Sequence, residues 1–241
     1  MAVGALSAGL AAQTESASRY DTAIQSDITQ QLAKKAEFRS LTASVEDGIV
    51  TLNGNVDLYQ QKLDATRKIR KLENVQGVRN LIVVSGKTVP DADLTAQLGR
   101  KVYYDRMGYD NVFNYVTVSV KDGVATLNGA VRIEYDRNSA MALVSATPGV
   151  KDVVDNITVD PVSTFDDNVR LRTLRAIYRD PALGRYAIDP ARPIRIVVDR
   201  GNVTLCGTVA TVMDKQIAGV RANQVLGAFT VRNDLQVAKR S

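Results

Sequence analysis

The 241-residue chain has no histidine, no tryptophan and one cysteine, Cys206. Without histidine, neither a Ser-His-Asp triad nor a Cys-His pair can form, and histidine-containing zinc sites are excluded. A single cysteine makes no internal disulfide and no thiolate metal cluster. Neither the dinucleotide-binding glycine pattern nor the P-loop pattern occurs. We therefore expect a protein that is not an enzyme, with no catalytic residues, no metal and no cofactor.

Long hydrophobic runs are missing as well. The small, apolar stretch 2–13 is too short to span a bilayer, so no transmembrane segment is expected. It turns polar at Thr14 and so resembles the apolar region and cleavage end of a secretory signal without its basic start. The alternative is a floppy chain end. We favour the remnant of an export signal within residues 1–19, which predicts a periplasmic or otherwise exported protein.

One strand-like segment, by contrast, is present three times. Each copy begins with an acidic residue and a turn glycine, alternates apolar and polar residues, and closes on a second glycine. The closing glycines Gly54, Gly129 and Gly207 lie 75 and 78 residues apart, which is long enough for one small domain per copy. The copies occupy residues 47–56, 122–131 and 199–209.

A second anchor lies at a nearly constant distance from each closing glycine. Asn80, Asn156 and Asn233 come 26, 27 and 26 residues after the closing glycines, and an alternating apolar run comes after each. The segment between the anchors is amphipathic at helical spacing, and another such helix precedes each copy. The order of elements is therefore helix, strand, strand, helix, strand.

This order predicts an α+β protein of three tandem small αββαβ domains, each a three-stranded mixed sheet with two helices on one face. The predicted boundaries are residues 1–19 for the flexible start, then 20–88, 89–160 and 161–241 for the three domains. Asp21 is expected to be an N-cap. The acidic pairs Asp91/Asp93 and Asp166/Asp167 could bind a cation, but their positions at helix starts favour capping and pairing with the helix dipole.

Positive charge gathers in the third copy, where residues 161–241 carry 13 Lys and Arg against seven Asp and Glu. Arg172, Arg175 and Arg179 are spaced three and four residues apart, so they form a stripe on one helix face. Such a stripe is a candidate for binding anionic head groups, and a solvated helix face is the alternative.

A second candidate group lies near the end of the helix that opens the second copy. It combines cations with an amphipathic aromatic residue, a combination that suits an interface between water and an apolar phase. Core packing of one of the neighbouring tyrosines, with exposure of the other, is the alternative. The group consists of Arg100, Lys101, Tyr104 and Arg106.

The repeated strand with its closing glycine, taken with the glycine and asparagine of the last strand, resembles the BON domain, named for bacterial osmotically induced and nodulation proteins. Three copies cover residues 20–239. The third departs from the pattern, with Cys206 in place of asparagine. The resemblance implies a non-catalytic exported protein of the bacterial envelope that binds phospholipid and supports envelope integrity under osmotic stress.

The competing hypothesis is a periplasmic protein-interaction module without lipid binding, in which free edge strands recruit partner proteins. The expected partner is thus an anionic phospholipid surface or an envelope protein. Nucleic acid is not expected, because the basic copy has few aromatic residues and no known reader motif. The oligomeric state is left open by the sequence.

Overall fold

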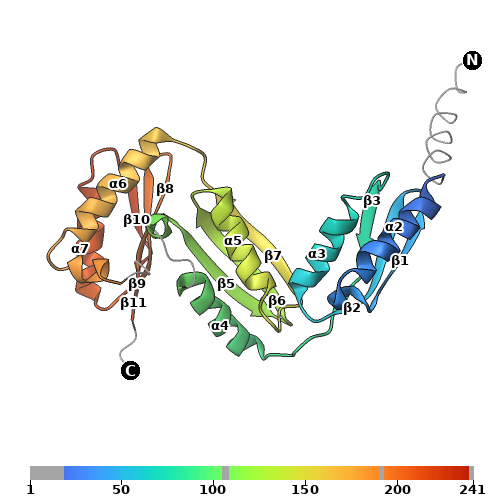
Figure 1. Ribbon diagram of the computed structural model, residues 1–241. Helices are drawn as coiled ribbons and strands as arrows, with labels where there is room; N and C mark the ends of the chain where they lie inside the picture. The colour runs from blue at the N-terminus through green and yellow to red at the C-terminus, as the bar shows by residue number, and fades with distance from the viewer. Residues whose placement is uncertain (1–18, 105–108, 190–192, 239–241) are drawn as a thin grey trace, which may run out of the picture. The chain divides into compact units, whose positions relative to one another are not determined.

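The computed structural model describes residues 19–104, 109–189 and 193–238. The stretch predicted to hold the export signal and the candidate residue Arg106 lie outside these ranges. The chain divides into two compact units, residues 1–90 with 145–152, and residues 91–144 with 153–241. The repeat seen in the sequence returns three times as the same order of elements, which confirms the α+β prediction (Figure 1).

The first repeat opens with a helix and a short 3-10 turn, continues with a hairpin, and closes with a helix and a broken last strand. Strand β2 is central, antiparallel to β1 and parallel to β3 and β4. The elements are α2 (Asp21–Ala33), η1 (Ala36–Phe38), β1 (Leu41–Glu46), β2 (Ile49–Val56), α3 (Tyr59–Ile69), β3 (Gly77–Asn80) and β4 (Val83–Val84).

The second and third repeats have the same plan, with β6 and β9 as their central strands. The second contains α4 (Asp91–Tyr104), η2 (Tyr109–Phe113), β5 (Tyr115–Lys121), β6 (Val124–Val131), α5 (Glu134–Ser145) and β7 (Asp152–Val159). The third contains α6 (Thr164–Tyr178), η3 (Gly184–Ala187), β8 (Ile194–Asp199), β9 (Asn202–Val209), α7 (Val212–Asn223), β10 (Thr230–Asn233) and β11 (Gln236–Val237).

In the first repeat, both helices pack on one face of the sheet because the apolar residues of β2 alternate. Val50 and Leu52 are fully buried there, with polar neighbours between them. Ile28 of α2 and Ile69 of α3 are fully buried in the same core. Burial of each such side chain stabilises the fold by about 1.5–3 kcal/mol relative to exposure.

The predicted single last strand is divided in two in the first and third repeats, so these sheets have four strands rather than three. In the first repeat the break falls after Asn80, whose side-chain oxygen accepts a hydrogen bond from the Ile82 backbone at 2.9 Å. Ile82 is 1% exposed and belongs to the core. The break therefore places an extra apolar residue in the core between β3 and β4.

The expected N-cap role of Asp21 is wrong, whereas the acidic pairs lie in the first turns of α4 and α6 as expected. Tyr20 is the N-cap residue of α2, and the cap of α6 is Ser163, whose hydroxyl accepts from the Asp166 backbone. Asp21 and Asp166 instead reach across to the hairpin turn of their own repeat. Each carboxylate accepts two hydrogen bonds from backbone N–H groups of that turn.

The second and third repeats are joined by direct contacts within one compact unit. Val112 and Phe113 of η2 belong to the buried core of the third repeat. Arg195 of β8 is 2% exposed, donates to the backbone carbonyl of Asn111, and holds its guanidinium carbon 4.8 Å from the centre of the Tyr103 ring. The second repeat thus covers part of the sheet of the third.

This contact accounts for the unusual residue of the third copy. Cys206 lies opposite Arg195 in the β8–β9 hairpin and is 6% exposed, whereas the equivalent Asn53 and Asn128 of the other repeats are exposed. Because side chains alternate along a strand, Cys206 lies on the face of β9 opposite its leucine neighbour. It is nevertheless buried, because that face meets the second repeat instead of water.

A second link between these repeats is an ion-pair network around Arg170. This residue is 2% exposed and pairs with Asp160 at 2.7 Å and Asp167 at 2.8 Å. Asp167 also pairs with Arg132 of the second repeat at 2.9 Å. Burial acts to raise the pKa of Asp167, but hydrogen bonds from Arg132 and Arg170 outweigh it and lower that pKa. The network needs both repeats in place.

Candidate functional site

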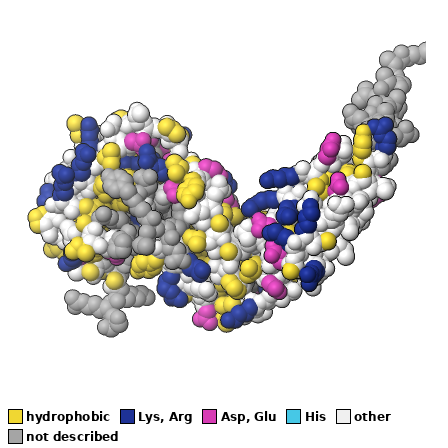
Figure 2. Space-filling model, viewed as in Figure 1, with side chains coloured by type: hydrophobic (Ala, Val, Ile, Leu, Met, Phe, Trp, Pro, Cys, Tyr) yellow, Lys and Arg dark blue, Asp and Glu magenta, His cyan; other side chains and the backbone are white. Residues whose placement is uncertain are grey.

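The three arginines predicted from the α6 sequence lie together on the surface of the third repeat. Arg172, Arg175 and Arg179 are all exposed and line one pocket of about 480 Å³. Arg221, from the last turn of α7, lines the same pocket. Figure 2 shows Lys and Arg side chains gathered over the α6 end of this repeat, with hydrophobic side chains beside them. The pocket therefore combines cations from two helices.

Two of these four arginines have partners within the protein. Arg221 Nε lies 2.6 Å from Asp180 Oδ2, and Arg172 Nη1 donates to the Leu226 carbonyl at 2.9 Å. Asp180 is buried, and its hydrogen bond from Arg221 lowers its pKa, so it stays charged. Within the described residues, Arg175 and Arg179 have no ion-pair partner. Their charges are available to an anion.

An apolar rim borders this pocket, and sequence reasoning missed it. Leu226 is 80% exposed and lines the pocket, while Phe229 is 71% exposed in the same loop after α7. Phe229 stacks on Phe165, at the start of α6, with ring centres 5.5 Å apart. Exposed apolar groups beside cations form the kind of surface that binds at the boundary between water and lipid. The sequence holds no signal for this rim, because the exposure of Leu226 and Phe229 depends on how α7 packs beside α6.

The second candidate group is not gathered into a site by the described residues. Arg100 is exposed, Lys101 is half-buried, and Tyr104 is 51% exposed. Tyr104 meets Tyr103 edge to face, with ring centres 4.8 Å apart. Tyr103, rather than Tyr104, makes the contact with the third repeat described above, and Arg106 lies outside the described residues.

Chemistry of other kinds has little support in the described part of the chain. No group of three or more acidic or cysteine side chains there is arranged to hold a metal ion. Burial raises the pKa of the Cys206 thiol to about 11, so at neutral pH it is protonated and a poor nucleophile. None of the helices in the described ranges has both the length and the hydropathy needed to cross a bilayer.

Comparison with known proteins adds one match in sequence and several distant ones in structure. A curated protein of Anaplasma centrale, described as an uncharacterized protein in the gshII 5′ region, is 29% identical over 57% of this chain and 93% of its own length. Among solved structures, CdsD, a structural protein of the type III secretion system of Chlamydia trachomatis, matches with 12% identity and a TM-score of 0.26 over 88% of this chain and 92% of its own.

The periplasmic domain of the type III secretion inner-membrane protein PrgH from S. typhimurium matches with 10% identity and a TM-score of 0.20 over 87% of this chain and all of its own. Both structural similarities are too weak to indicate a function.

The match to a family model is extensive. The model described as BON domain matches residues 20–86, 90–161 and 181–239. These three segments cover most of the chain, and one falls in each of the three repeats. The third match begins after α6, so the arginines of that helix lie outside it. With three tandem copies, the chain belongs to the BON domain family.

Proposed function

We propose that this protein is a non-catalytic, exported envelope protein whose third repeat associates with anionic phospholipid surfaces and so supports envelope integrity or osmotic stress tolerance. The observation that carries the proposal is the pocket lined by Arg172, Arg175, Arg179 and Arg221, with Leu226 exposed beside it. Each arginine close to an anionic surface contributes on the order of 1 kcal/mol. The exposed apolar rim adds a contribution that does not depend on salt.

The four arginines differ in how strongly other groups of the protein hold them, so they would contribute unequally to binding. Arg221 is held by buried Asp180 and Arg172 by a backbone carbonyl, so Arg175 and Arg179 would supply most of the attraction to phosphate. Leu226 and Phe229 would enter the boundary between head groups and acyl chains. Both side chains are largely exposed, even though Phe229 stacks on Phe165, and insertion would remove their apolar area from water.

Co-sedimentation of the full chain with vesicles tests the proposal. Vesicles of phosphatidylglycerol and of phosphatidylcholine would be compared at low and high salt, with the variant Arg172→Glu/Arg175→Glu/Arg179→Glu. We expect binding to the anionic vesicles that weakens with salt and is lost in the variant. Lack of binding to either vesicle at low salt would contradict the proposal.

A matched control separates a local site from net charge. Arg70→Glu/Lys71→Glu/Arg79→Glu makes the same change in charge at exposed positions of the first repeat. This control should bind anionic vesicles much as the unmodified protein does. If the two triple variants lose binding equally, the attraction is a general charge effect and the α6 pocket is not its site.

A protein partner is the second candidate function, and a different feature favours it. The first repeat carries an open groove beside a sheet edge, a geometry that suits pairing with an extended segment of another protein. This surface is far from the arginines in the sequence and can be tested independently of them.

A further inference from the structure

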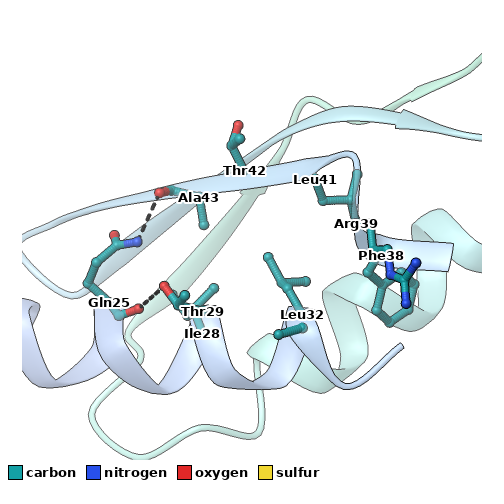
Figure 3. Close-up of a pocket in the computed structure, with 10 residues that line it drawn as sticks. Gln25, Ile28, Thr29, Leu32, Phe38, Arg39, Leu41, Thr42 and Ala43 are labelled. Carbon is teal, nitrogen blue, oxygen red and sulfur yellow. Dashed lines mark hydrogen bonds between the residues drawn. The ribbon is translucent and has the colours of Figure 1, made fainter. Parts of the chain in front are cut away.

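The groove of the first repeat lies between the first helix and the first strand. It has a volume of about 420 Å³ and takes its lining from three consecutive elements, α2, η1 and β1 (Figure 3). Its floor is apolar, with Leu32, Phe38 and Leu41 among the lining residues, and Arg39 stands at its rim. An apolar floor beside a strand suits a side chain that enters from an extended segment.

Strand β1 is the edge strand of its sheet, since β2 is its one neighbour in the strand order. The carbonyl of Ala43 points away from β2 and accepts a hydrogen bond from the Gln25 side chain at 3.1 Å. Because backbone groups alternate along an antiparallel strand, those of Leu41 and Val45 point the same way. This edge of β1 therefore presents backbone donors and acceptors along the groove.

In the third repeat, the position equivalent to this groove is filled by a side chain of the protein itself. Tyr178 ends α6, and its hydroxyl donates to the Ile194 carbonyl at 2.7 Å and accepts from the Ile194 N–H at 3.2 Å. Ile194 is opposite Gly207, as Leu41 is opposite Gly54. Thus an aromatic residue of the first helix satisfies both backbone groups at this edge position.

The residue equivalent to Tyr178 differs between repeats. Counted from the aspartate that bonds the hairpin turn, the position is Tyr178 in the third repeat, Tyr103 in the second and Ala33 in the first. Ala33 lines the groove. The small side chain leaves open the space that an aromatic ring occupies in the third repeat.

We propose that the first repeat binds an extended segment of a partner protein, which pairs with the β1 edge and places an aromatic side chain in the space above Ala33. The Tyr178 contact in the third repeat is the internal template for this occupant. The bound segment would donate to the Ala43 carbonyl in place of the Gln25 amide. The site goes beyond the lipid surface proposed for the third repeat and shares no residue with it.

The positive charge of Arg39 at the rim of the groove indicates which residue the bound segment should carry beside its aromatic one. Arg39 is exposed, and within the described residues it has no ion-pair partner. An acidic residue next to the aromatic one in the bound segment would complement it. The chemical class is thus an extended peptide with one aromatic and one adjacent acidic side chain, recognised by backbone hydrogen bonds that do not depend on the rest of its sequence.

Selection from a displayed library of random dodecapeptides tests the proposal. The full chain is the bait, and the variant Ala33→Tyr, which copies the third repeat, is used for counter-selection. Enriched peptides are synthesised and their affinities measured by fluorescence anisotropy. We expect the enriched peptides to share an aromatic residue beside an acidic one. These peptides should bind Ala33→Tyr at least about tenfold more weakly than the unmodified chain, and they should also bind Arg39→Glu more weakly.

A second closing variant keeps the test valid if Ala33→Tyr fails to fold. Gln25→Arg copies Arg170, which donates to the Val198 carbonyl on the equivalent edge at 2.6 Å. It should also weaken binding. Hydrogen exchange of the complex should be slowed at the amides of Leu41 and Val45. Three results would each overturn the proposal. The first is a selection in which no peptide is enriched over the counter-selection bait, and the second is equal peptide affinity for both closing variants and the unmodified chain. The third is hydrogen exchange that slows only outside β1.

The lipid surface of the third repeat and the peptide groove of the first repeat can be tested independently of each other. The Arg172→Glu/Arg175→Glu/Arg179→Glu chain should bind the selected peptides with unchanged affinity, and Ala33→Tyr should co-sediment with anionic vesicles as the unmodified chain does. Loss of peptide binding in the triple arginine variant would contradict the groove as the site.

Discussion

The carboxylate of Asp91, at the start of α4, accepts a hydrogen bond from the backbone N–H of Gly123 at 3.0 Å and another from Asp122 at 2.7 Å. Both turn residues have positive φ angles, 79° and 55°, which direct their N–H groups out of the hairpin ladder. The same contact joins Asp21 to Gly48 at 2.8 Å and Asp166 to Gly201 at 2.7 Å. One aspartate therefore ties helix to hairpin in every repeat.

The first prediction concerns this aspartate. Asp91→Ala leaves two turn N–H groups without their acceptor and should lower the free energy of unfolding by about 1–3 kcal/mol. Asp93→Ala is the matched control, because Asp93 lies in the same first turn of α4 but is exposed. Urea denaturation followed by circular dichroism compares the two. Equal destabilisation would mean that the helix dipole, rather than the turn contact, accounts for the effect.

A second prediction concerns the contact between the second and third repeats. Arg195→Thr introduces the residue found at the equivalent positions, Thr42 and Thr117. It removes the hydrogen bond to Asn111 and the contact with Tyr103, so the buried face should open to solvent. The single thiol, Cys206, reports this opening. Its alkylation by iodoacetamide should speed up by about tenfold or more, because thiol reactivity depends on access.

The control for this experiment is Arg79→Thr, at an exposed strand position of the first repeat. It should leave the alkylation rate unchanged. An Arg195→Thr protein whose thiol stays as slow as in the unmodified chain would show that Cys206 is shielded without help from the second repeat.

The third prediction is the pH dependence of that thiol. Burial raises the pKa of Cys206 from the ordinary 9.0 to about 11, and the charge of Asp234 acts in the same direction. The folded state therefore holds the thiol proton more tightly than the unfolded state. The resulting stability is fully present below pH 9 and is lost as pH rises through 11.

Urea denaturation of the unmodified protein and of Cys206→Ala at several pH values isolates this effect. Between pH 9 and 11, the unfolding free energy of the unmodified protein should fall relative to that of Cys206→Ala. The alkylation rate of the unmodified protein should rise over the same range. A pH-independent difference between the two proteins would contradict a raised thiol pKa.

Repeat number and element order could be predicted from the sequence because turn glycines and alternating strands are local signals. Spacing along the chain pairs Asn156 with Asn80, although Asn156 lies one residue further from its closing glycine. In the structure Asp155 takes this place, since its carboxylate accepts from the Ile157 N–H at 3.0 Å as Asn80 does from Ile82. It pairs with Arg137 at 2.7 Å, so an ion pair replaces an amide contact.

The site was predictable only in part, for a similar reason. Helical spacing places Arg172, Arg175 and Arg179 on one face, and they do line one pocket. Spacing within one helix does not reveal which other helix packs beside it, so Arg221 and the Leu226 loop could not be predicted. The groove depends on the small side chain of Ala33, where the other repeats have Tyr103 and Tyr178. This difference is visible only when the repeats are aligned from the aspartate that bonds each hairpin turn.

The last prediction concerns acid stability of the third repeat. The hydrogen bond from Arg221 lowers the pKa of Asp180, with help from the Ala182 N–H at 2.8 Å. The folded state therefore binds this proton less readily than the unfolded state, whose ordinary value is 3.8. The pair contributes stability above pH 3.8, which is lost as pH falls through the lowered pKa of the folded state.

Removing the guanidinium should raise the pKa of Asp180, so Arg221→Met is expected to unfold at a higher pH on acid titration. Arg232→Met is the matched control, because Arg232 pairs with Asp234 at 2.8 Å but both side chains are largely exposed, and such pairs add little. Circular dichroism between pH 7 and about 2 gives both midpoints, across the range in which carboxylates titrate. If Arg221→Met and Arg232→Met shift the midpoint equally, the buried Asp180 does not stabilise the fold more than an exposed carboxylate does. Arg221 would then not be held by Asp180, and its charge would be available to an anion like those of Arg175 and Arg179.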